Sequence, residues 1–291
     1  MRLAIAEDLP RGDVTSRALF PPGLRARARI VARENAVVAG LAAADAVFRE
    51  IEPNIDARAE KADGAPVRDG DSVAPGDTVL RLDGHALAIL AGERTALNFL
   101  ARLSGVATLT RAFVDAVAGT GVRVLDTRKT TPGWRTLEKA AVRSGGGTNH
   151  RADASSMILV KDNHRLLAGS VKACLAGIAE FESRLAGGSP ARAGSASKRL
   201  PVEIEAESLD DVRALVAAGV ERILLDNMPV EMLREAVAIA RASGRTIALE
   251  ASGGVRLESV RQIAETGVDA ISAGALTHSA RAIDFSLEIE R

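Results

Sequence analysis

The sequence lacks several features that define whole classes of protein. Cys174 is the only cysteine among the 291 residues, which excludes an intramolecular disulfide and any metal site built from several cysteines. We expect Cys174 to pack within a helix. Tyrosine is absent and aromatic residues make up only 2% of the chain, so stacking platforms for nucleic-acid bases are not expected. No apolar run approaches the roughly 20 residues that a membrane-spanning helix requires.

An excess of charge of either sign is also missing. The 38 basic and 38 acidic residues cancel to a formal net charge of +0, which argues against a nucleic-acid partner. Residues 1–8 carry acids where a signal peptide would carry its apolar core, so we expect a cytoplasmic protein. The expected target is a small anion.

Positive charge is nevertheless concentrated in one part of the chain. Four of the six lysines fall between residues 129 and 172, and Lys129 and Lys161 each end an apolar run. Arginines and a histidine accompany them in the segments 126–133 and 149–151. Lys and Arg side chains are the natural ligands of phosphates and carboxylates, so this concentration indicates an anion-binding site.

The pattern of apolar residues divides the chain into two parts. Residues 25–82 combine an alternating strand at 25–32 with Gly- and Pro-rich turns, and a long helical pattern runs from Glu93 to about Ala118. Six short apolar runs then follow: 122–125, 157–160, 202–204, 222–225, 247–249 and 270–272. Successive runs are spaced regularly from Glu205 onward. The distances along the chain from Glu205 to Asp226, Glu250 and Ser272 in turn are 21, 24 and 22 residues, the length of one strand and one helix. This pattern predicts a parallel sheet of the β/α-barrel type with fewer than eight strands, and a surface excursion at 186–199.

Polar residues occur at the carboxyl end of every one of these runs: Asp126–Lys129, Lys161, Glu205, Asp226, Ser252–Gly254 and Gly274. In β/α barrels the carboxyl ends of the strands form the mouth of the active site. We therefore expect these residues to meet in one pocket of an enzyme.

The residue types at these positions suggest their ligands. Gly253 and Gly274 would let backbone amides approach a phosphate, although glycine in such turns also serves purely conformational needs. Glu205 and Asp226 could hold Mg²⁺, or they could form salt bridges with lysines across the mouth. The positive charges exceed what one phosphate needs, which implies several anionic groups; they come from Arg128, Lys129, His150, Arg151 and Lys161.

Six segments together resemble the quinolinate phosphoribosyltransferase family, also called nicotinate-nucleotide pyrophosphorylase (carboxylating). They are DTRKT at 126–130, GGGTNHR at 145–151, KDNH at 161–164, LDNM at 225–228, EASGG at 250–254 and GALTHS at 274–279. The similarity extends from residues 7–9 and 12–15 nearly to the carboxyl terminus. The resemblance implies a glycosyltransferase, more narrowly a pentosyltransferase, that converts quinolinate and 5-phosphoribosyl 1-pyrophosphate to nicotinate mononucleotide, CO₂ and pyrophosphate in NAD biosynthesis.

The resemblance also implies an architecture and an assembly. An amino-terminal α/β-sandwich domain over residues 1–105, joined by residues 279–291, would precede an incomplete β/α barrel over residues 106–278. The family implies a homodimer or a hexamer of three dimers, in which Arg94 is donated into the active site of the neighbouring subunit. Nucleic acid and membranes are not expected as partners.

Carried over residue by residue, the family assigns a role to each candidate. Arg128, His150 and Arg151 would bind the carboxylates of quinolinate, with Lys129 and Lys161 nearby. Lys129, Glu205 and Asp226 would be catalytic, with Glu205 and Asp226 serving the ribose and the Mg²⁺–pyrophosphate group. The 5′-phosphate would be held by Ser252, Gly253 and Gly274.

Some positions depart from the family pattern, and two rival functions are compatible with part of the sequence. Residues 152–156 read ADASS where the family has Gly-Leu and a polar residue, and Trp134 replaces a leucine. A paralogous group encoded with molybdenum transport shares the scaffold. Lys161 could instead form a Schiff base in an aldolase, and the Gly-rich cradle could belong to a sensor of a phosphorylated ligand.

Overall fold

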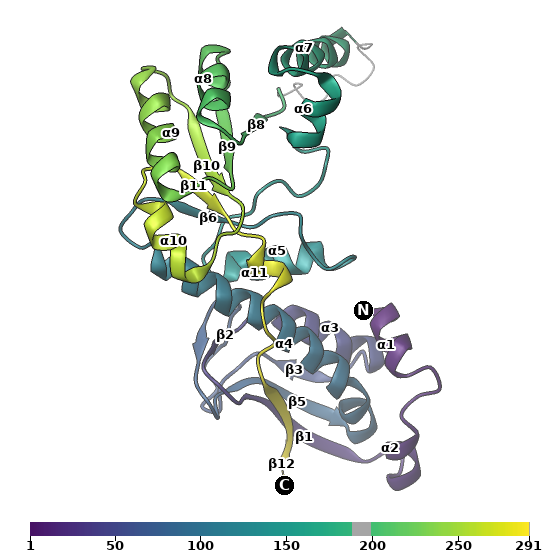
Figure 1. Cartoon of the computed structure of the whole chain (residues 1–291). Helices are drawn as coiled ribbons and strands as arrows, with labels where there is room; N and C mark the ends of the chain where they lie inside the picture. The colour runs from purple at the N-terminus through teal and green to yellow at the C-terminus, as the bar shows by residue number, and fades with distance from the viewer. Residues whose placement is uncertain (188–198, 291) are drawn as a thin grey trace. The chain divides into compact units, whose positions relative to one another are not determined.

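The computed structural model describes residues 1–187 and 199–290, and the chain divides into two compact units (Figure 1). The first unit comprises residues 1–114, 129–148 and 275–290, and the second comprises residues 115–128 and 149–274 without 188–198. The domain boundary expected between residues 105 and 106 stays a prediction. The excursion expected at 186–199 lies almost wholly outside the described residues.

The second unit is built on a six-stranded parallel sheet. Its strands are β6 (Arg123–Leu125), β7 (Ile158–Val160), β8 (Val202–Ala206), β9 (Arg222–Asp226), β10 (Ala248–Ser252) and β11 (Ala270–Ser272). They are arranged in the order β6-β11-β10-β9-β8-β7, and each neighbouring pair is parallel. Because β6 and β7 form the two edges, the sheet is open, which confirms the predicted incomplete barrel.

Helices return the chain from one strand to the next, as continuous apolar strands in a parallel sheet require. The helices α8 (Leu209–Ala217), α9 (Val230–Ala242) and α10 (Leu257–Ala264) each bury one apolar stripe, for example Val212 and Leu215 of α8. Two further helices, α6 (Asp162–Ala168) and α7 (Val171–Gly187), follow β7. Cys174 is buried in α7, as expected from the sequence.

The first unit contains an antiparallel sheet in the order β12-β1-β5-β3. Its strands are β1 (Arg25–Ala32), β3 (Asp56–Arg58), β5 (Thr78–His85) and β12 (Phe285–Glu290), and a separate pair is formed by β2 (Ala36–Val37) and β4 (Ser72–Val73). The predicted alternating strand is confirmed as β1. Its helices are α1 (Arg2–Asp8), α2 (Val14–Leu19), α3 (Leu41–Ile51), α4 (Ala86–Ala116), α5 (Arg135–Ser144) and α11 (Ala275–His278).

The long helix α4 begins at Ala86, seven residues before the helical start expected at Glu93. The segment from Ala86 to Ala91 is rich in alanine and leucine, the strongest helix formers, so the helix extends back to the end of β5. Gly92 weakens a helix by its flexibility, yet it is required here because a Cβ atom would press against Phe48 of α3.

The segment after α11 runs along α4 before it enters the sheet as β12. The Ile283 amide donates a hydrogen bond of 3.0 Å to the Ala101 carbonyl, and a Cβ atom on Gly105 would collide with the Arg281 carbonyl. Residues from β12 then pair with β1, with Leu287 opposite Ile30.

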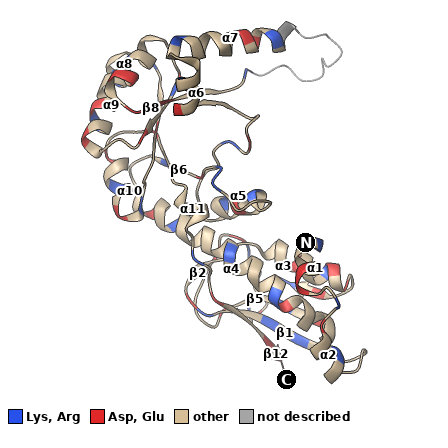
Figure 2. Ribbon diagram, turned by 45° about the vertical axis from the view of Figure 1, so that its right-hand side comes forward, with Lys and Arg blue, Asp and Glu red and all other residues tan. Residues whose placement is uncertain are grey.

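Lysine, arginine and acidic residues are interspersed along the ribbon of both units, and basic residues alternate on β1 (Figure 2). Arg25 and Arg27 of β1 share one partner, Asp83 of β5, so this basic row is only partly neutralised by β5. Among the described residues no helix is both long enough and apolar enough to cross a membrane.

Candidate active site

The predicted site residues of the second unit lie at the carboxyl edge of its sheet. Glu205 is the penultimate residue of β8, Asp226 ends β9 and Ser252 ends β10, while Lys161 directly follows β7 and Gly274 follows β11 by two residues. Ser252 lies opposite Asp226 in the register of β10 and β9. Because all six strands are parallel, these residues share one edge, as the sequence predicts.

Asp126, which directly follows β6, holds the segment Asn149–Arg151 in place. Its side chain is fully buried, with 0% exposed. One carboxylate oxygen accepts a hydrogen bond of 2.8 Å from the His150 amide, and the other accepts one of 2.6 Å from Asn149 Nδ2. A buried carboxylate with two donors from one short loop fixes the backbone of that loop.

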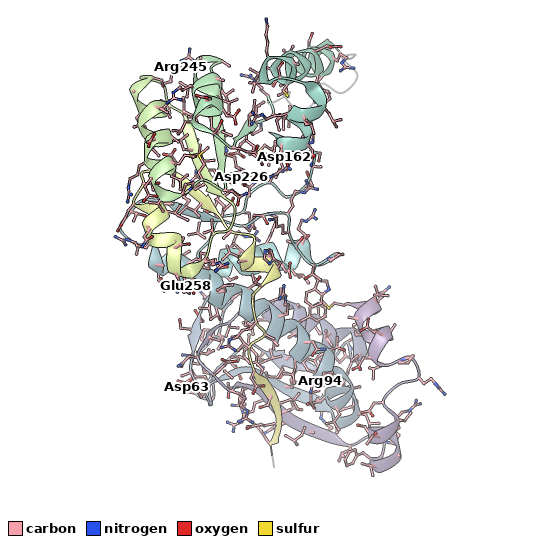
Figure 3. The ribbon with its side chains drawn as sticks, in the orientation of Figure 1. Asp63, Arg94, Asp162, Asp226, Arg245 and Glu258 are labelled. Carbon is pink, nitrogen blue, oxygen red and sulfur yellow. The ribbon has the colours of Figure 1, made fainter. Side chains whose placement is uncertain are left out.

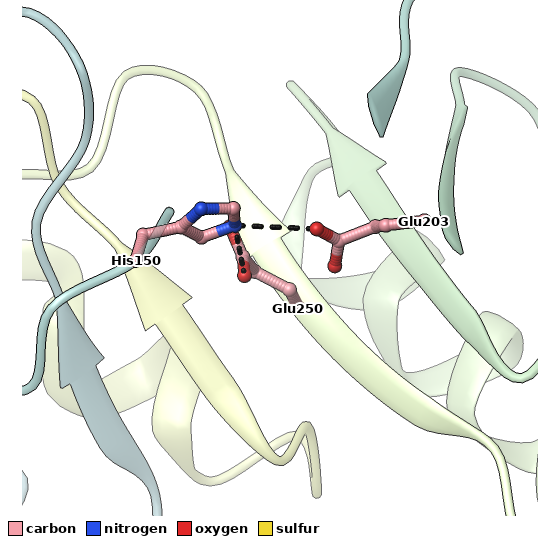
Figure 4. Close-up of side chains that lie close together, drawn as sticks. All are labelled: His150, Glu203 and Glu250. Atoms are coloured by element: carbon pink, nitrogen blue, oxygen red, sulfur yellow. Dashed lines mark hydrogen bonds and ion pairs between the residues drawn. The ribbon is translucent and has the colours of Figure 1, made fainter. Parts of the chain in front are cut away.

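The ring of His150 lies between two buried glutamates (Figure 4). Nε2 is 3.2 Å from Oε2 of Glu203 in β8 and 3.2 Å from Oε2 of Glu250 in β10. Burial by itself would lower the pKa of His150, but the hydrogen bonds to both glutamates and their charges outweigh it and raise the pKa to about 9. The amide of Arg151, 2.7 Å from Nδ1, opposes protonation of that nitrogen, yet one dipole is weaker than two carboxylate charges, so the upward direction prevails.

Arg151 is half-buried next to another cation. Its guanidinium donates a hydrogen bond of 3.3 Å to the carbonyl oxygen of Met157. Burial, followed by the nearby Arg128 guanidinium, lowers the pKa of Arg151. Two guanidinium groups that repel each other are stabilised by an anion bound to both, so this pair is suited to a carboxylate ligand.

Lys161 forms an ion pair with Glu205. The ammonium nitrogen is 2.8 Å from Oε2 of Glu205, whose side chain is only 3% exposed, and the Asp162 amide donates to Oε1 at 3.1 Å. The Arg165 guanidinium also donates to the Glu205 carbonyl at 2.9 Å. The salt bridge between an acid and a lysine, which the sequence left open as an alternative to metal binding, is therefore present.

The turn after β9 is tightly packed against the turn after β10. Asn227 has a φ of +53°, a left-handed conformation that is uncommon outside glycine, and its amide donates to the Ser252 carbonyl at 2.9 Å. A Cβ atom on Gly253 would collide with the Asn227 side chain. Asn227 Nδ2 donates to Asp226 at 2.5 Å, so Asp226, Ser252 and Gly253 form one rigid unit at the sheet edge.

Two groups of residues in the second unit could hold a metal ion. His150, Glu203 and Glu250 form one group, and Asp162, Glu205 and Glu207 form the other; in each group the potential ligand atoms lie within 4.8 Å of one another. Asp226 belongs to neither group. The predicted pairing of Glu205 with Asp226 around Mg²⁺ stays a prediction.

Lys129 begins the first unit's segment 129–148, and its backbone is anchored there by a buried network. The Thr277 hydroxyl donates to the Lys129 carbonyl at 2.7 Å. Arg102 donates to the Thr277 carbonyl and, at 2.8 Å, to the fully buried Glu138. Glu138 in turn accepts from the amide of Thr131 at 3.0 Å and from its hydroxyl at 2.9 Å. The exposed Lys129 side chain thus extends from a rigid backbone.

Two other residues singled out from the sequence belong to the first unit. Arg94 lies on α4 and is exposed, and it has no hydrogen-bond or ion-pair partner among the described residues (Figure 3). Trp134, which departs from the family pattern, stacks on Phe99 with 4.5 Å between ring centroids. The substitution is therefore accommodated in a stacked aromatic pair.

Sequence reasoning missed three acids that organise the site: Glu203, Glu250 and Glu138. Glu203 and Glu250 are charged residues within otherwise apolar strands, and burial of a charge without a partner is costly. That signal was available, but the sequence did not reveal that His150 is the partner of both. Glu138 gave no signal because an acid in a polar helix is common.

Comparison with known proteins agrees with the fold of both units. Residues 13–104 match the N-terminal domain of quinolinate phosphoribosyl transferase, and residues 106–288 match its C-terminal domain. The nicotinate-nucleotide pyrophosphorylase [carboxylating] of Mycobacterium leprae is 39% identical over 294 residues, covering 99% of this chain and 95% of that protein. The chloroplastic protein of the same name from Oryza sativa is 38% identical over 308 residues, covering 100% of this chain and 76% of its own length. The crystal structure of NadC from Streptococcus pyogenes superimposes with a TM-score of 0.86 at 35% identity, covering 100% of this chain and 95% of that one.

Proposed function

The chain belongs to the quinolinate phosphoribosyltransferase family, and we infer that it joins quinolinate to 5-phosphoribosyl 1-pyrophosphate in NAD biosynthesis. The products are nicotinate mononucleotide, CO₂ and pyrophosphate. The observation that carries this conclusion is that the family match extends over both units and includes the cationic and acidic residues at the carboxyl edge of the sheet.

The proximity of Arg128 and Arg151 supports a role in binding quinolinate. Quinolinate carries two adjacent carboxylates on a pyridine ring, and two neighbouring guanidinium groups can each bind one of them. Arg128 is close enough to lower the pKa of Arg151, so the two charges are near each other before any ligand binds. Lys161 and His150, which are ion-paired with glutamates, would complete the same site, and Lys129 would act on the reacting groups.

The reaction needs acids as well as cations. When the pyridine nitrogen attacks C1 of the ribose and pyrophosphate leaves, positive charge develops on the sugar ring. Glu205 and Asp226 would stabilise that charge and orient the ribose hydroxyls. Both carboxylates lie at the carboxyl edge of one sheet and offer the oxygen atoms that Mg²⁺ prefers, which supports a role for them in holding the metal. Mg²⁺, when bound, would neutralise the negative charge that develops on the pyrophosphate.

The turns after β10 and β11 would receive the 5′-phosphate of the ribose. Gly253 has a φ of +89°, a left-handed conformation that favours glycine, and the lack of a side chain would let its backbone approach a phosphate closely. Ser252 would add a hydroxyl donor, and Gly274, in the turn after β11, would let the backbone approach the phosphate closely. The rigid contact of this turn with Asn227 would hold those donors in place before the substrate binds.

Loss of CO₂ completes the proposed reaction. Once the ring nitrogen is bonded to C1 of the ribose, it carries a positive charge beside C2 of the pyridine. The bond from C2 to its carboxylate breaks, its electron pair stays on C2, and C2 takes up one proton. The second carboxylate is retained in the product, so an arginine that binds it keeps the ring in position throughout.

The assembly and the location are further parts of the proposal. The exposed Arg94 would be donated to the active site of a second copy in a homodimer or a hexamer of dimers. A cytoplasmic location is compatible with a chain that has a single cysteine.

One assay tests the function. The purified protein is incubated with quinolinate, phosphoribosyl pyrophosphate and Mg²⁺, and nicotinate mononucleotide is measured, with nicotinate as the comparison acceptor. Product from quinolinate and none from nicotinate is expected. Tight binding without turnover would favour a ligand sensor, and trapping of Lys161 by borohydride with a carbonyl substrate would favour an aldolase. The pairing of Lys161 with Glu205 speaks against the aldolase, because a Schiff base needs a neutral, unengaged amine.

A further inference from the structure

The segment Asn149–Arg151 has no helical or strand structure, yet residues in two strands of the second unit and directly after a third hold it. Asp126, which follows β6, accepts hydrogen bonds from the His150 amide and from Asn149. Glu203 of β8 and Glu250 of β10 hold the imidazole ring of His150. Hydrogen bonds thus hold both the backbone and the ring of His150.

Burial of the two glutamates is unfavourable in free energy. The side chains of Glu203 and Glu250 are only 3% and 7% exposed, and both share the single donor Nε2 of His150. Oε1 of Glu250 has no hydrogen-bond partner among the described residues. Like charges at this depth lower the stability of a fold, and apolar residues of similar size would pack a sheet more favourably. Their presence therefore calls for a function other than stability.

The ring of His150 connects these acids to the anion-binding arginine. Nδ1 lies 2.7 Å from the amide of Arg151, and the guanidinium of Arg151 reaches the Met157 carbonyl. Rotation of the His150 ring would break the hydrogen bond from the Arg151 amide, which helps to hold the backbone that carries the Arg151 side chain. The position of Arg151 relative to Arg128 consequently depends on what the ring of His150 contacts.

We propose that Glu203 and Glu250 are positioning residues that act through His150 to hold Arg151 beside Arg128, in the geometry that binds an aromatic acid with two adjacent carboxylates. This inference rests on the proposed function and adds to it a pair of acids that touch neither substrate. The ring of His150, with Nε2 3.2 Å from a carboxylate oxygen of each glutamate, is the contact through which the two acids would act. The alternative is a divalent cation bound by His150, Glu203 and Glu250. Such a cation would take the place of a proton on Nε2 of His150.

The test replaces each acid by its isosteric amide, in Glu203→Gln and Glu250→Gln. Steady-state kinetics are measured with quinolinate and with phosphoribosyl pyrophosphate as the varied substrate. The KM for quinolinate is expected to rise about ten- to a hundred-fold, the scale for removing a buried partner of a functional group, while the KM for phosphoribosyl pyrophosphate stays within about twofold. Asp269→Asn is the matched control, because Asp269 is an ion-paired acid at the amino-terminal end of β11 in the same unit.

Two further variants separate positioning from a merely structural role. The Glu250→Gln change is expected to have no further effect on quinolinate KM in a His150→Ala background, because its action passes through that ring. His150→Gln keeps an N–H donor for the two acids and is expected to recover part of the affinity lost in His150→Ala. These comparisons remain informative if one of the glutamate variants fails to fold.

Several results would overturn the proposal. They are an unchanged quinolinate KM in both glutamate variants, an equal rise of both KM values, no advantage of His150→Gln over His150→Ala, or Mn²⁺ binding that Glu250→Gln abolishes. A wild-type protein that makes no nicotinate mononucleotide would instead refute the proposed function, so the two failures are distinguishable.

Discussion

The hydroxyl of Thr277 donates a hydrogen bond of 2.7 Å to the carbonyl oxygen of Lys129, although the two residues are 148 positions apart in the chain. Thr277 is fully buried at the end of α11, whereas the Lys129 side chain is exposed. The contact fixes the backbone of Lys129, whose side chain is the most exposed among those of the proposed catalytic residues. Catalysis depends on how reproducibly such a group is placed.

Thr277→Val should therefore reduce turnover without removing any group that contacts a substrate. The isosteric change deletes only the hydroxyl, and we expect kcat to fall about tenfold, equivalent to ~1.4 kcal/mol of barrier. Thr266→Val is the matched control, because the hydroxyl of Thr266 also donates to a carbonyl at 2.7 Å but lies in the turn that follows α10. Equal kinetics in the two variants would show that this anchor of Lys129 is unimportant.

Lys129→Ala is expected to keep the fold and to lose most turnover. The exposed side chain contributes little to packing, while loss of a preorganised charge typically costs on the order of 10²–10³ in rate. Circular dichroism checks the fold, and product formation checks the rate. Lys172→Ala, at an exposed position of α7, should behave like the wild type. Wild-type turnover in the Lys129 variant would contradict its assigned role.

Mixing Arg94→Ala with Lys129→Ala tests whether an active site is shared between subunits. Each variant alone should be nearly inactive. In a randomly mixed dimer population about a quarter of the sites would combine an intact Arg94 with an intact Lys129, so about a quarter of wild-type activity should return. Absence of any recovery after subunit exchange, verified by sedimentation of tagged chains, would place both residues in the same subunit's site.

Activity is expected to depend on a divalent cation that the Asp226 carboxylate binds. Chelation by EDTA should abolish turnover, and added Mg²⁺ should restore it. Asp226→Asn keeps the size of the side chain but removes its charge, so the Mg²⁺ concentration for half-maximal activity should rise about tenfold or more, as one carboxylate ligand is lost. Asp269→Asn again provides the control. A variant with an unchanged Mg²⁺ requirement would remove Asp226 from the metal site.

The folded state should lose stability as the pH rises toward 9. The pKa of His150 is raised from 6.5 to about 9, so the folded protein holds a proton that the unfolded chain releases near 6.5. This contribution is fully present below pH 6.5 and disappears as the pH rises through about 9. Urea unfolding of the wild type and of His150→Asn between pH 6 and 9.5 checks the effect. Parallel pH dependence in the two proteins would show that His150 does not cause it.

The parallel sheet and most of its edge residues could be predicted from the sequence because both depend on local patterns. Apolar runs such as residues 222–225 define strands, and a polar residue such as Asp226 directly after a run lies at the sheet edge in any parallel arrangement. Lys161 and Glu205 could be placed at the same edge by this reasoning. The sequence could not decide whether Glu205 forms an ion pair with a lysine or binds a metal ion.

The packing of His150 between two acids could not be predicted in the same way. Glu203 and Glu250 lie in different strands, and β9 separates them in the sheet. Which loop reaches both depends on the path of the chain after α5, where no periodic pattern exists. The helix start at Ala86 could not be predicted for a different reason: Gly92 interrupts the helical pattern, and its packing against Phe48, which requires a glycine there, is visible only in the structure.

The last described strand completes a sheet whose other members are among the first parts of the chain to be synthesised. On the ribosome, β1 must wait with one edge unpaired until the whole parallel sheet and residues 285–290 have emerged. During that interval the free edge of β1, which contains Ile30 and its apolar neighbours, can pair with strands of other chains. The three arginines at its start, Arg25, Arg27 and Arg29, supply the charge that discourages such pairing before β12 arrives.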